Sequence, residues 1–139
     1  MFSVIIKYRK LGLPLSLQIH LFDIMVVLTL LYGSEVWGIE NVNLIDQFQL
    51  KFYKIILKLK QSTPNCMIYG DLGILPLSIH INTRILCYWN KILNCKDEKI
   101  NSILYRTSYK LYNDGVIKLP WISYVHDLLN YLGMTNVVV

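Results

Sequence analysis

The chain has 139 residues, of which 54% are apolar and only 17% are charged, and its formal net charge is +5. The length suits one domain with a real core, but soluble domains average about 25% charged residues, so part of the surface should be covered or the chain is a piece of a larger protein. The basic balance favours nucleic acid or an anionic membrane as partner, without excluding a protein that binds neither.

Cysteine spacing argues against two common ways of stabilising a small protein. Cys66, Cys87 and Cys95 are odd in number and show no C-x-x-C spacing, so neither a disulfide framework nor a zinc knuckle is expected. The three histidines lie far apart in the sequence and show no ligand spacing. We therefore expect reduced and mostly buried thiols in an intracellular protein, nuclear or cytoplasmic, with no metal and no other cofactor.

The first predicted helix begins near Pro14, which suits a first helical turn because the N–H that it lacks would have no partner there. Apolar residues then continue to Leu31 or Tyr32 on nearly every side of the helix, which predicts burial nearly all round. Residues 15–32 have the length of a short membrane span, but polar residues interrupt them at Gln18, His20 and Asp23. Because such residues are costly in lipid, a buried core helix is favoured over a membrane anchor.

The stretch LLYGSEVWG, residues 30–38, ends this helix in a tight turn. Gly33 is predicted to stop the helix. Tyr32 and Trp37 are predicted to wedge against neighbouring helices, and Glu35 to accept hydrogen bonds from backbone N–H groups of the next segment. Glu35 has no second acid, base or nucleophile at a helpful spacing, so we expect a structural turn and no catalytic residue.

A second helix is predicted over about residues 41–60, and one side of it carries Lys54 and Lys58, with Lys51 at the boundary of that side. Lys60 points away from Lys54 and Lys58 on an ideal helical wheel, so it joins them only if the helix frays. A helix that presents several lysines can follow a phosphate backbone, so these three lysines are candidate nucleic-acid contacts. The alternative is a solvated charged face without a ligand.

Residues 61–76 contain several prolines and glycines and predict a turn-rich connector, with a short helix near 64–69 as one option. A third long helix is predicted from Leu77 to about Asn94. Its polar side carries a second basic strip, in which the further candidate contacts are Arg84 and Lys91.

Trp89 shares the apolar face of the third helix, which predicts core packing for this ring instead of base stacking. Two shorter helices are predicted near residues 99–112 and 121–132, and the tail, 133–139, is either a short strand or a frayed end. Because apolar residues repeat with a helical period almost throughout, we predict an all-α fold, a compact bundle of four to five helices in one domain.

Two blocks of the sequence together resemble a known family. The first is an apolar helix that ends in YGSEVW (32–37) and precedes a helix rich in Phe and Lys. The second runs from STPN (62–65) through YGDLG (69–73) to a Pro-Leu pair, and LPWISYV (119–125) is similar in kind. These blocks are similar to the segment that follows the catalytic core in reverse transcriptases of non-LTR (LINE-type) retrotransposons, over about residues 11–132.

The resemblance implies that residues 11–60 correspond to a thumb-like helix pair, residues 61–76 to a connector and residues 77–132 to further helices. In this family the thumb follows the palm and grips the template–primer duplex. The implied partners are therefore an RNA–DNA or template–primer duplex and the palm and fingers that the chain lacks. The expected origin is a truncated element whose reading frame begins at Met1.

The resemblance does not extend to polymerase chemistry, which needs carboxylates that hold two metal ions. In the family, two of these are paired aspartates in a Phe/Tyr-Ala-Asp-Asp turn. The chain has no Asp-Asp pair, and its one adjacent acidic pair, Asp97-Glu98, lacks the aromatic strand context. We expect a non-catalytic fragment that contacts nucleic acid. The alternatives are a helical protein–protein interaction module and a small membrane-associated protein.

Overall fold

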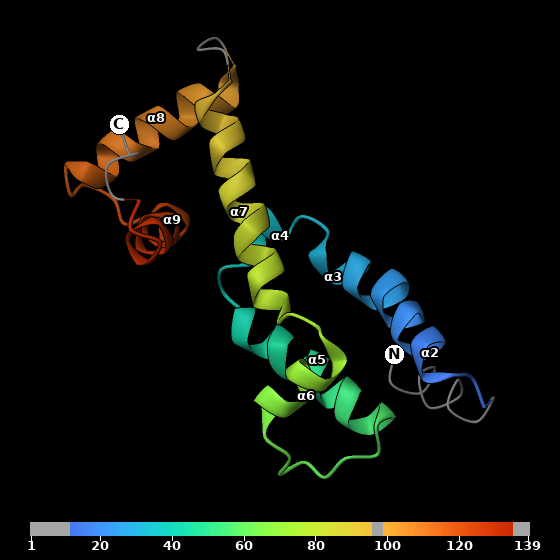
Figure 1. Ribbon diagram of the computed structural model, residues 1–139. Coiled ribbons are helices and arrows are strands. Elements are labelled where there is room, and N and C mark those ends of the chain that lie inside the picture. The colour runs from blue at the N-terminus through green and yellow to red at the C-terminus, as the bar shows by residue number, and fades with distance from the viewer. Residues whose placement is uncertain (1–11, 96–98, 135–139) are drawn as a thin grey trace. The chain divides into compact units, whose positions relative to one another are not determined.

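The structure is a computed structural model that describes residues 12–95 and 99–134. Within these residues every regular element is helical and no strand occurs, so the predicted all-α fold is confirmed (Figure 1). The elements are α2 (Leu15–Phe22), the π-helical η1 (Asp23–Val27), α3 (Leu28–Leu31), α4 (Ser34–Trp37), α5 (Val42–Ile56), α6 (Asn65–Leu72), α7 (Leu77–Leu93), α8 (Ile100–Asn113) and α9 (Pro120–Tyr131).

The predicted long helices are all present, and α6 lies where the connector allowed a short helix. The described chain divides into two compact units. Unit 1 comprises residues 12–32 and 41–80, and unit 2 comprises residues 33–40 together with the described residues from 81 onward. The organisation as one domain stays a prediction. The acidic pair at 97–98 and most of the tail lie outside the described residues.

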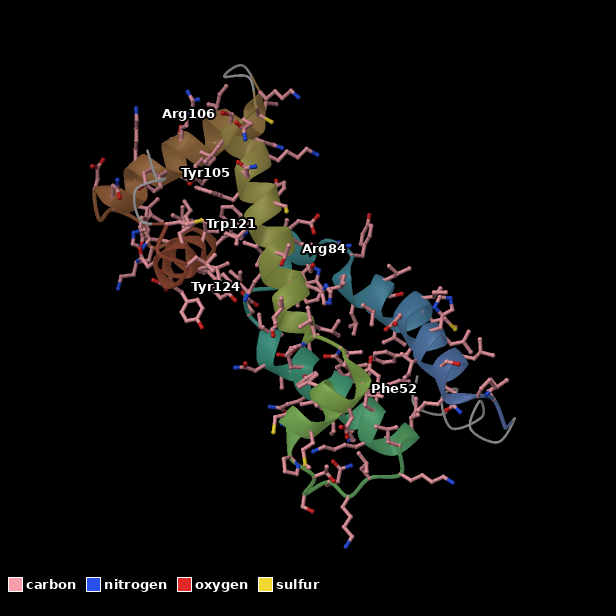
Figure 2. All side chains as sticks on the ribbon, in the orientation of Figure 1. Phe52, Arg84, Tyr105, Arg106, Trp121 and Tyr124 are labelled. Atoms are coloured by element: carbon pink, nitrogen blue, oxygen red, sulfur yellow. The ribbon has the colours of Figure 1, made fainter. Side chains whose placement is uncertain are left out.

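The core of unit 1 is built on aromatic rings from α2 and α5. The rings of Phe22 and Phe52 stack with centroids 3.7 Å apart, and Tyr53 meets both rings edge-on. Val26 and Ile68 are buried in the same cluster. Figure 2 marks Phe52 on α5. Because large rings contribute much of the apolar area that folding removes from water, this cluster holds the helix on which the candidate lysines lie.

The first helix is less buried than its composition predicted. Phe22, Val26 and Leu31 are buried, but Ile24 and Leu28 are about half exposed, at 49% and 58%. Only one side of the α2–η1–α3 run packs on the core, so the expectation of burial nearly all round is wrong. The π-helical turn within this run adds a residue to one turn and so shifts the register of the faces that follow.

Two side chains of α5 hold the start of α7. The Ser78 N–H donates to Asp46 Oδ1 at 2.8 Å, and the Leu77 N–H donates to Gln49 Oε1 at 3.1 Å. Gln49 is buried and its amide also donates to the Leu75 carbonyl. These bonds satisfy N–H groups that a helix start leaves without intrahelical partners, and they fix the connector against α5.

The core of unit 2 lies between α7, α8 and α9. The buried side chains of α7 in this unit recur at helical spacing, at Ile81, Ile85, Trp89 and Ile92. The Trp89 indole N–H donates to the Tyr105 hydroxyl at 2.8 Å, so the prediction that Trp89 packs in the core is confirmed. The cysteines differ from expectation, because Cys66 and Cys87 are exposed and only Cys95 is half-buried.

Candidate nucleic-acid interface

Lys54 does not lie on an exposed strip of α5. Its side chain is buried, with only 7% of the residue exposed. The ammonium group donates to the Gln61 carbonyl at 2.9 Å and to Asn65 Oδ1 at 3.1 Å. The prediction of an exposed lysine face is therefore wrong at this position, because the chain after α5 folds back over the side chain.

Lys58 lies beyond the helix on which it was predicted. α5 ends at Ile56, and Lys58 adopts a left-handed conformation with φ 57°. The Leu59 N–H donates to the Lys54 carbonyl at 2.9 Å and the Lys58 N–H donates to the Ile55 carbonyl, the pair of bonds that defines a Schellman motif. The predicted extension to residue 60 is wrong, and the turn places both Lys58 and Lys60 in exposed positions.

A polar depression of about 280 Å³ lies beside this turn. We call it the lysine depression, and its lining residues are Gln47, Leu50, Lys51, Lys54, Gln61 and Asn65. Two of these carry ammonium groups, three carry amides, and none carries a carboxylate. Hydrogen-bond donors without a competing negative charge favour an anionic ligand.

The two candidates on α7 differ from each other. Arg84 lies 3.9 Å from the Glu35 carboxylate, and both side chains are partly exposed. Lys91 is exposed in the last turn of α7, where a positive charge also suits the end of the helix dipole. Part of the charge of Arg84 is thus balanced within the protein, which makes it a weaker phosphate contact than an exposed lysine.

The predicted structural turn is present, but its side chains act differently from expectation. Gly33 adopts the left-handed conformation, with φ 65°, that ends the helix as predicted. Tyr32 is 84% exposed and Trp37 is 39% exposed, so neither ring is wedged deeply between helices. Glu35 accepts the Trp121 indole N–H through its backbone carbonyl at 2.8 Å, whereas its carboxylate faces Arg84.

Gly38 has a role in this turn that the sequence pattern did not reveal. A Cβ atom at this position would lie 2.4 Å from the Ser34 carbonyl oxygen and 2.5 Å from Ile81 Cγ2. Only glycine therefore lets the end of α4 approach α7 so closely.

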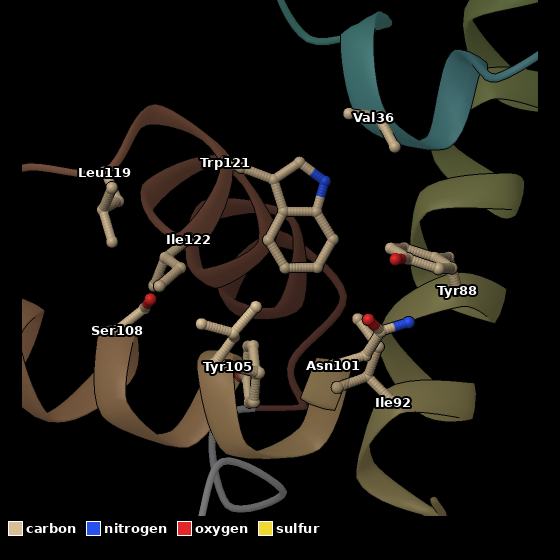
Figure 3. Close-up of a pocket in the computed structure, with 10 residues that line it drawn as sticks. Val36, Tyr88, Ile92, Asn101, Tyr105, Ser108, Leu119, Trp121 and Ile122 are labelled. Carbon is tan, nitrogen blue, oxygen red and sulfur yellow. The ribbon is translucent and has the colours of Figure 1, made fainter. Parts of the chain in front are cut away.

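Unit 2 contains an apolar cavity of about 300 Å³. Figure 3 shows Trp121 of α9 at its centre, with Tyr105 on α8, Tyr88 on α7 and Val36 on α4 around it. The Trp121 ring meets both tyrosine rings edge-on. The sequence pattern does not indicate this cavity, because its lining comes from four separate elements.

Asn65 and Gln61 are two polar members of the lysine depression that the sequence pattern did not indicate. Both belong to the connector, where Asn and Gln normally indicate only a turn or a solvated loop. Their proximity to Lys54 depends on how the chain returns after α5, and the pattern of residues holds no signal for that path. Among the described residues, no group of three or more His, Cys, Asp and Glu side chains could hold a metal ion.

Comparison with known proteins found no relative: no family model matches the chain, and no curated protein or solved structure matches it. The resemblance to retrotransposon reverse transcriptases therefore stays a prediction from the sequence. None of the described helices combines the length and the apolar character that crossing a membrane requires.

Proposed function

We propose that this chain is a non-catalytic module that contacts the phosphate backbone of a nucleic-acid duplex, as a reverse-transcriptase thumb contacts its template–primer. The observation that carries the proposal is the lysine cluster at the end of α5. Lys51, Lys58 and Lys60 are exposed there, beside a depression whose lining includes no carboxylate.

The physical basis is the release of counterions from nucleic acid. Each phosphate that an ammonium group neutralises releases bound cations, which favours association at low salt. Lys51 lies within α5, and the turn after the helix carries Lys58 and Lys60, so unit 1 presents three separate charges that need no base contact. The expected partner is therefore a duplex recognised by its backbone, such as an RNA–DNA hybrid, without sequence preference.

The test is binding of a fluorescent RNA–DNA hybrid to the full chain, measured by anisotropy. A triple variant, Lys51→Glu, Lys58→Glu and Lys60→Glu, should bind at least about a hundredfold more weakly than the wild type at low salt, because three favourable contacts become repulsive. Lys54 is left intact so that the turn after α5 keeps its hydrogen bonds.

The matched control replaces three exposed lysines of unit 2 in the same way: Lys99→Glu, Lys110→Glu and Lys118→Glu. Both triple variants change the net charge from +5 to −1, since each substitution changes it by −2. If the control loses as much affinity as the test variant, binding depends on overall charge alone and the proposed interface is wrong.

A second candidate function is binding of another protein, and the aromatic cavity of unit 2 favours it. Tyr and Trp side chains around an apolar hollow are typical of the centres of protein interfaces. Association through this cavity would persist at about 200 mM salt, where phosphate contacts weaken strongly. Self-association that is insensitive to salt and is lost in Trp121→Ala would support this candidate.

A further inference from the structure

We propose that the lysine depression is a discrete oxyanion site that holds one phosphate group. Lys51, Lys54 and the side-chain amide of Asn65 supply donors, and Lys54 also orients the Asn65 amide. The inference rests on the proposed function, since the expected source of the phosphate is the backbone of a bound nucleic acid. It goes further because it assigns one phosphate to one set of atoms.

The buried charge of Lys54 is the first observation that points to an anion. An ammonium group is costly to remove from water unless its charge is compensated. Lys54 is buried, yet within the described residues its two acceptors are neutral oxygens, the Gln61 carbonyl and Asn65 Oδ1. An ammonium group has three N–H donors, so one remains for a ligand. An anion in the adjoining depression would supply both a negative charge that balances the ammonium group and an acceptor for its third N–H.

The orientation of Asn65 is the second observation. Because Oδ1 accepts the bond from Lys54, the opposite side of the amide carries Nδ2 and its two N–H donors. Asn65 is also the first residue of α6, and the start of a helix favours negative charge. Lys54 thereby determines which side of the Asn65 amide is left for a ligand, and that side can only donate hydrogen bonds.

The size of the depression suits this ligand. Its volume of about 280 Å³ accommodates a phosphate group together with several waters, each of which takes about 30 Å³ in the liquid. The amides of Gln47 and Gln61 line the same space and can donate to oxygens of the phosphate or to bridging waters. The donors come from α5, from the turn that follows it and from α6, so the site exists only in the folded chain.

The decisive variant is Asn65→Asp in the full chain. The new carboxylate keeps an acceptor for Lys54 and adds an ion pair, so the turn should stay closed. The same change removes the Nδ2 donors and places a negative charge where phosphate would lie. The matched control is Asn43→Asp, which makes the same substitution at an exposed position in the first turn of α5.

The probe is inorganic phosphate, titrated into ¹⁵N-labelled protein and followed by NMR. We expect saturable shifts for residues 47–65 in the wild type and in Asn43→Asp, and affinity at least about tenfold weaker in Asn65→Asp. Equal affinity in Asn65→Asp, or no saturable shift in the wild type, would overturn the site. If Asn65→Asp does not fold, Lys51→Gln takes its place, with Lys118→Gln as its control.

The RNA–DNA hybrid provides the second arm of the experiment. Phosphate binding that Asn65→Asp abolishes, without any binding of the hybrid, would support the oxyanion site and contradict the proposed function. Hybrid binding that is equal in the wild type and Asn65→Asp, without saturable phosphate shifts, would support the function and contradict the site.

Discussion

The ammonium group of Lys54 is not in solvent. It is buried, and its hydrogen bonds stabilise the turn after α5. Its hydrogen bonds join residues seven and eleven positions further along the chain. Hydrogen bonds to a charged group contribute more to stability than neutral ones, about 1.5–3 kcal/mol each. A lysine that a helical wheel assigns to an exposed face is thus a structural residue that also borders the proposed phosphate site.

Tyr53 is one residue through which alkali should destabilise unit 1. Burial and then the nearby Asp23 carboxylate raise the pKa of Tyr53 to about 12. The folded protein therefore holds this proton more tightly than the unfolded chain does, so the contribution of Tyr53 is complete below about pH 10 and falls as the pH rises toward 12.

We expect the wild type to lose about 2 kcal/mol more of its free energy of unfolding than Tyr53→Phe loses between about pH 9 and pH 12. Urea unfolding at both pH values measures the difference. Tyr131→Phe is the control, because Tyr131 is exposed. This variant should lose as much free energy of unfolding between the two pH values as the wild type does. If Tyr53→Phe and the wild type lose the same free energy of unfolding, Tyr53 is not responsible for the loss in alkali.

At the scale of elements, the end of α5 decides how the lysines are displayed. The Schellman motif requires a left-handed residue after the helix, a position that glycine usually fills. Gly33 fills such a position in this chain, but after α5 the residue is Lys58. A side chain there costs about 1–2 kcal/mol, and it places a positive charge on the turn beside the lysine depression.

Lys58→Gly should therefore stabilise the fold. We expect the free energy of unfolding to rise by about 0.5–1 kcal/mol, since the relief of backbone strain exceeds the entropic cost of glycine in the unfolded chain. Urea denaturation measures the change. Lys60→Gly removes the same charge at a residue without a left-handed φ and should not stabilise. A fall in stability for Lys58→Gly would show that the lysine side chain contributes more than its backbone costs.

The start of α7 is a second feature decided between elements. Asp46 and Gln49 belong to α5, yet they accept the N–H groups of Ser78 and Leu77. A local capping pattern would place such an acceptor next to the helix in sequence. Here the acceptors lie about thirty residues earlier, so packing within unit 1 supplies the cap.

For the whole molecule, the positions of the charges that make up the net charge of +5 determine how binding depends on salt. If Lys51, Lys58 and Lys60 each neutralise one phosphate, each should contribute about 0.9 to the slope of log affinity against log salt concentration. We expect Lys51→Gln, Lys58→Gln and Lys60→Gln each to reduce that slope by about 0.9, as measured by hybrid binding over a series of salt concentrations.

Lys118→Gln changes the net charge by the same amount and should leave the slope as in the wild type. Slopes that are indistinguishable among all four variants would mean that the lysines act through a general field and not through separate phosphate contacts. Such a result would count against the interface even if the affinity itself fell.

The helices can be predicted from local sequence patterns. Their apolar residues repeat with a helical period, and prolines and glycines mark most of their ends, so Leu77–Leu93 and the two later helices lie close to where the pattern predicts them. These signals are local, because hydrogen bonds within a helix join residues only four positions apart. The end of α5 was missed because no Gly or Pro marks it.

The exposure of each charge and the grouping of residues into sites depend instead on how the helices and the connector pack. A helical wheel places Lys54 on the polar side of α5, but the returning connector buries Lys54 and brings Asn65 to it. The aromatic cavity likewise draws its lining from four elements. Burial and site geometry depend on contacts between residues far apart in sequence, and the free energy of those contacts is defined only when the whole chain folds.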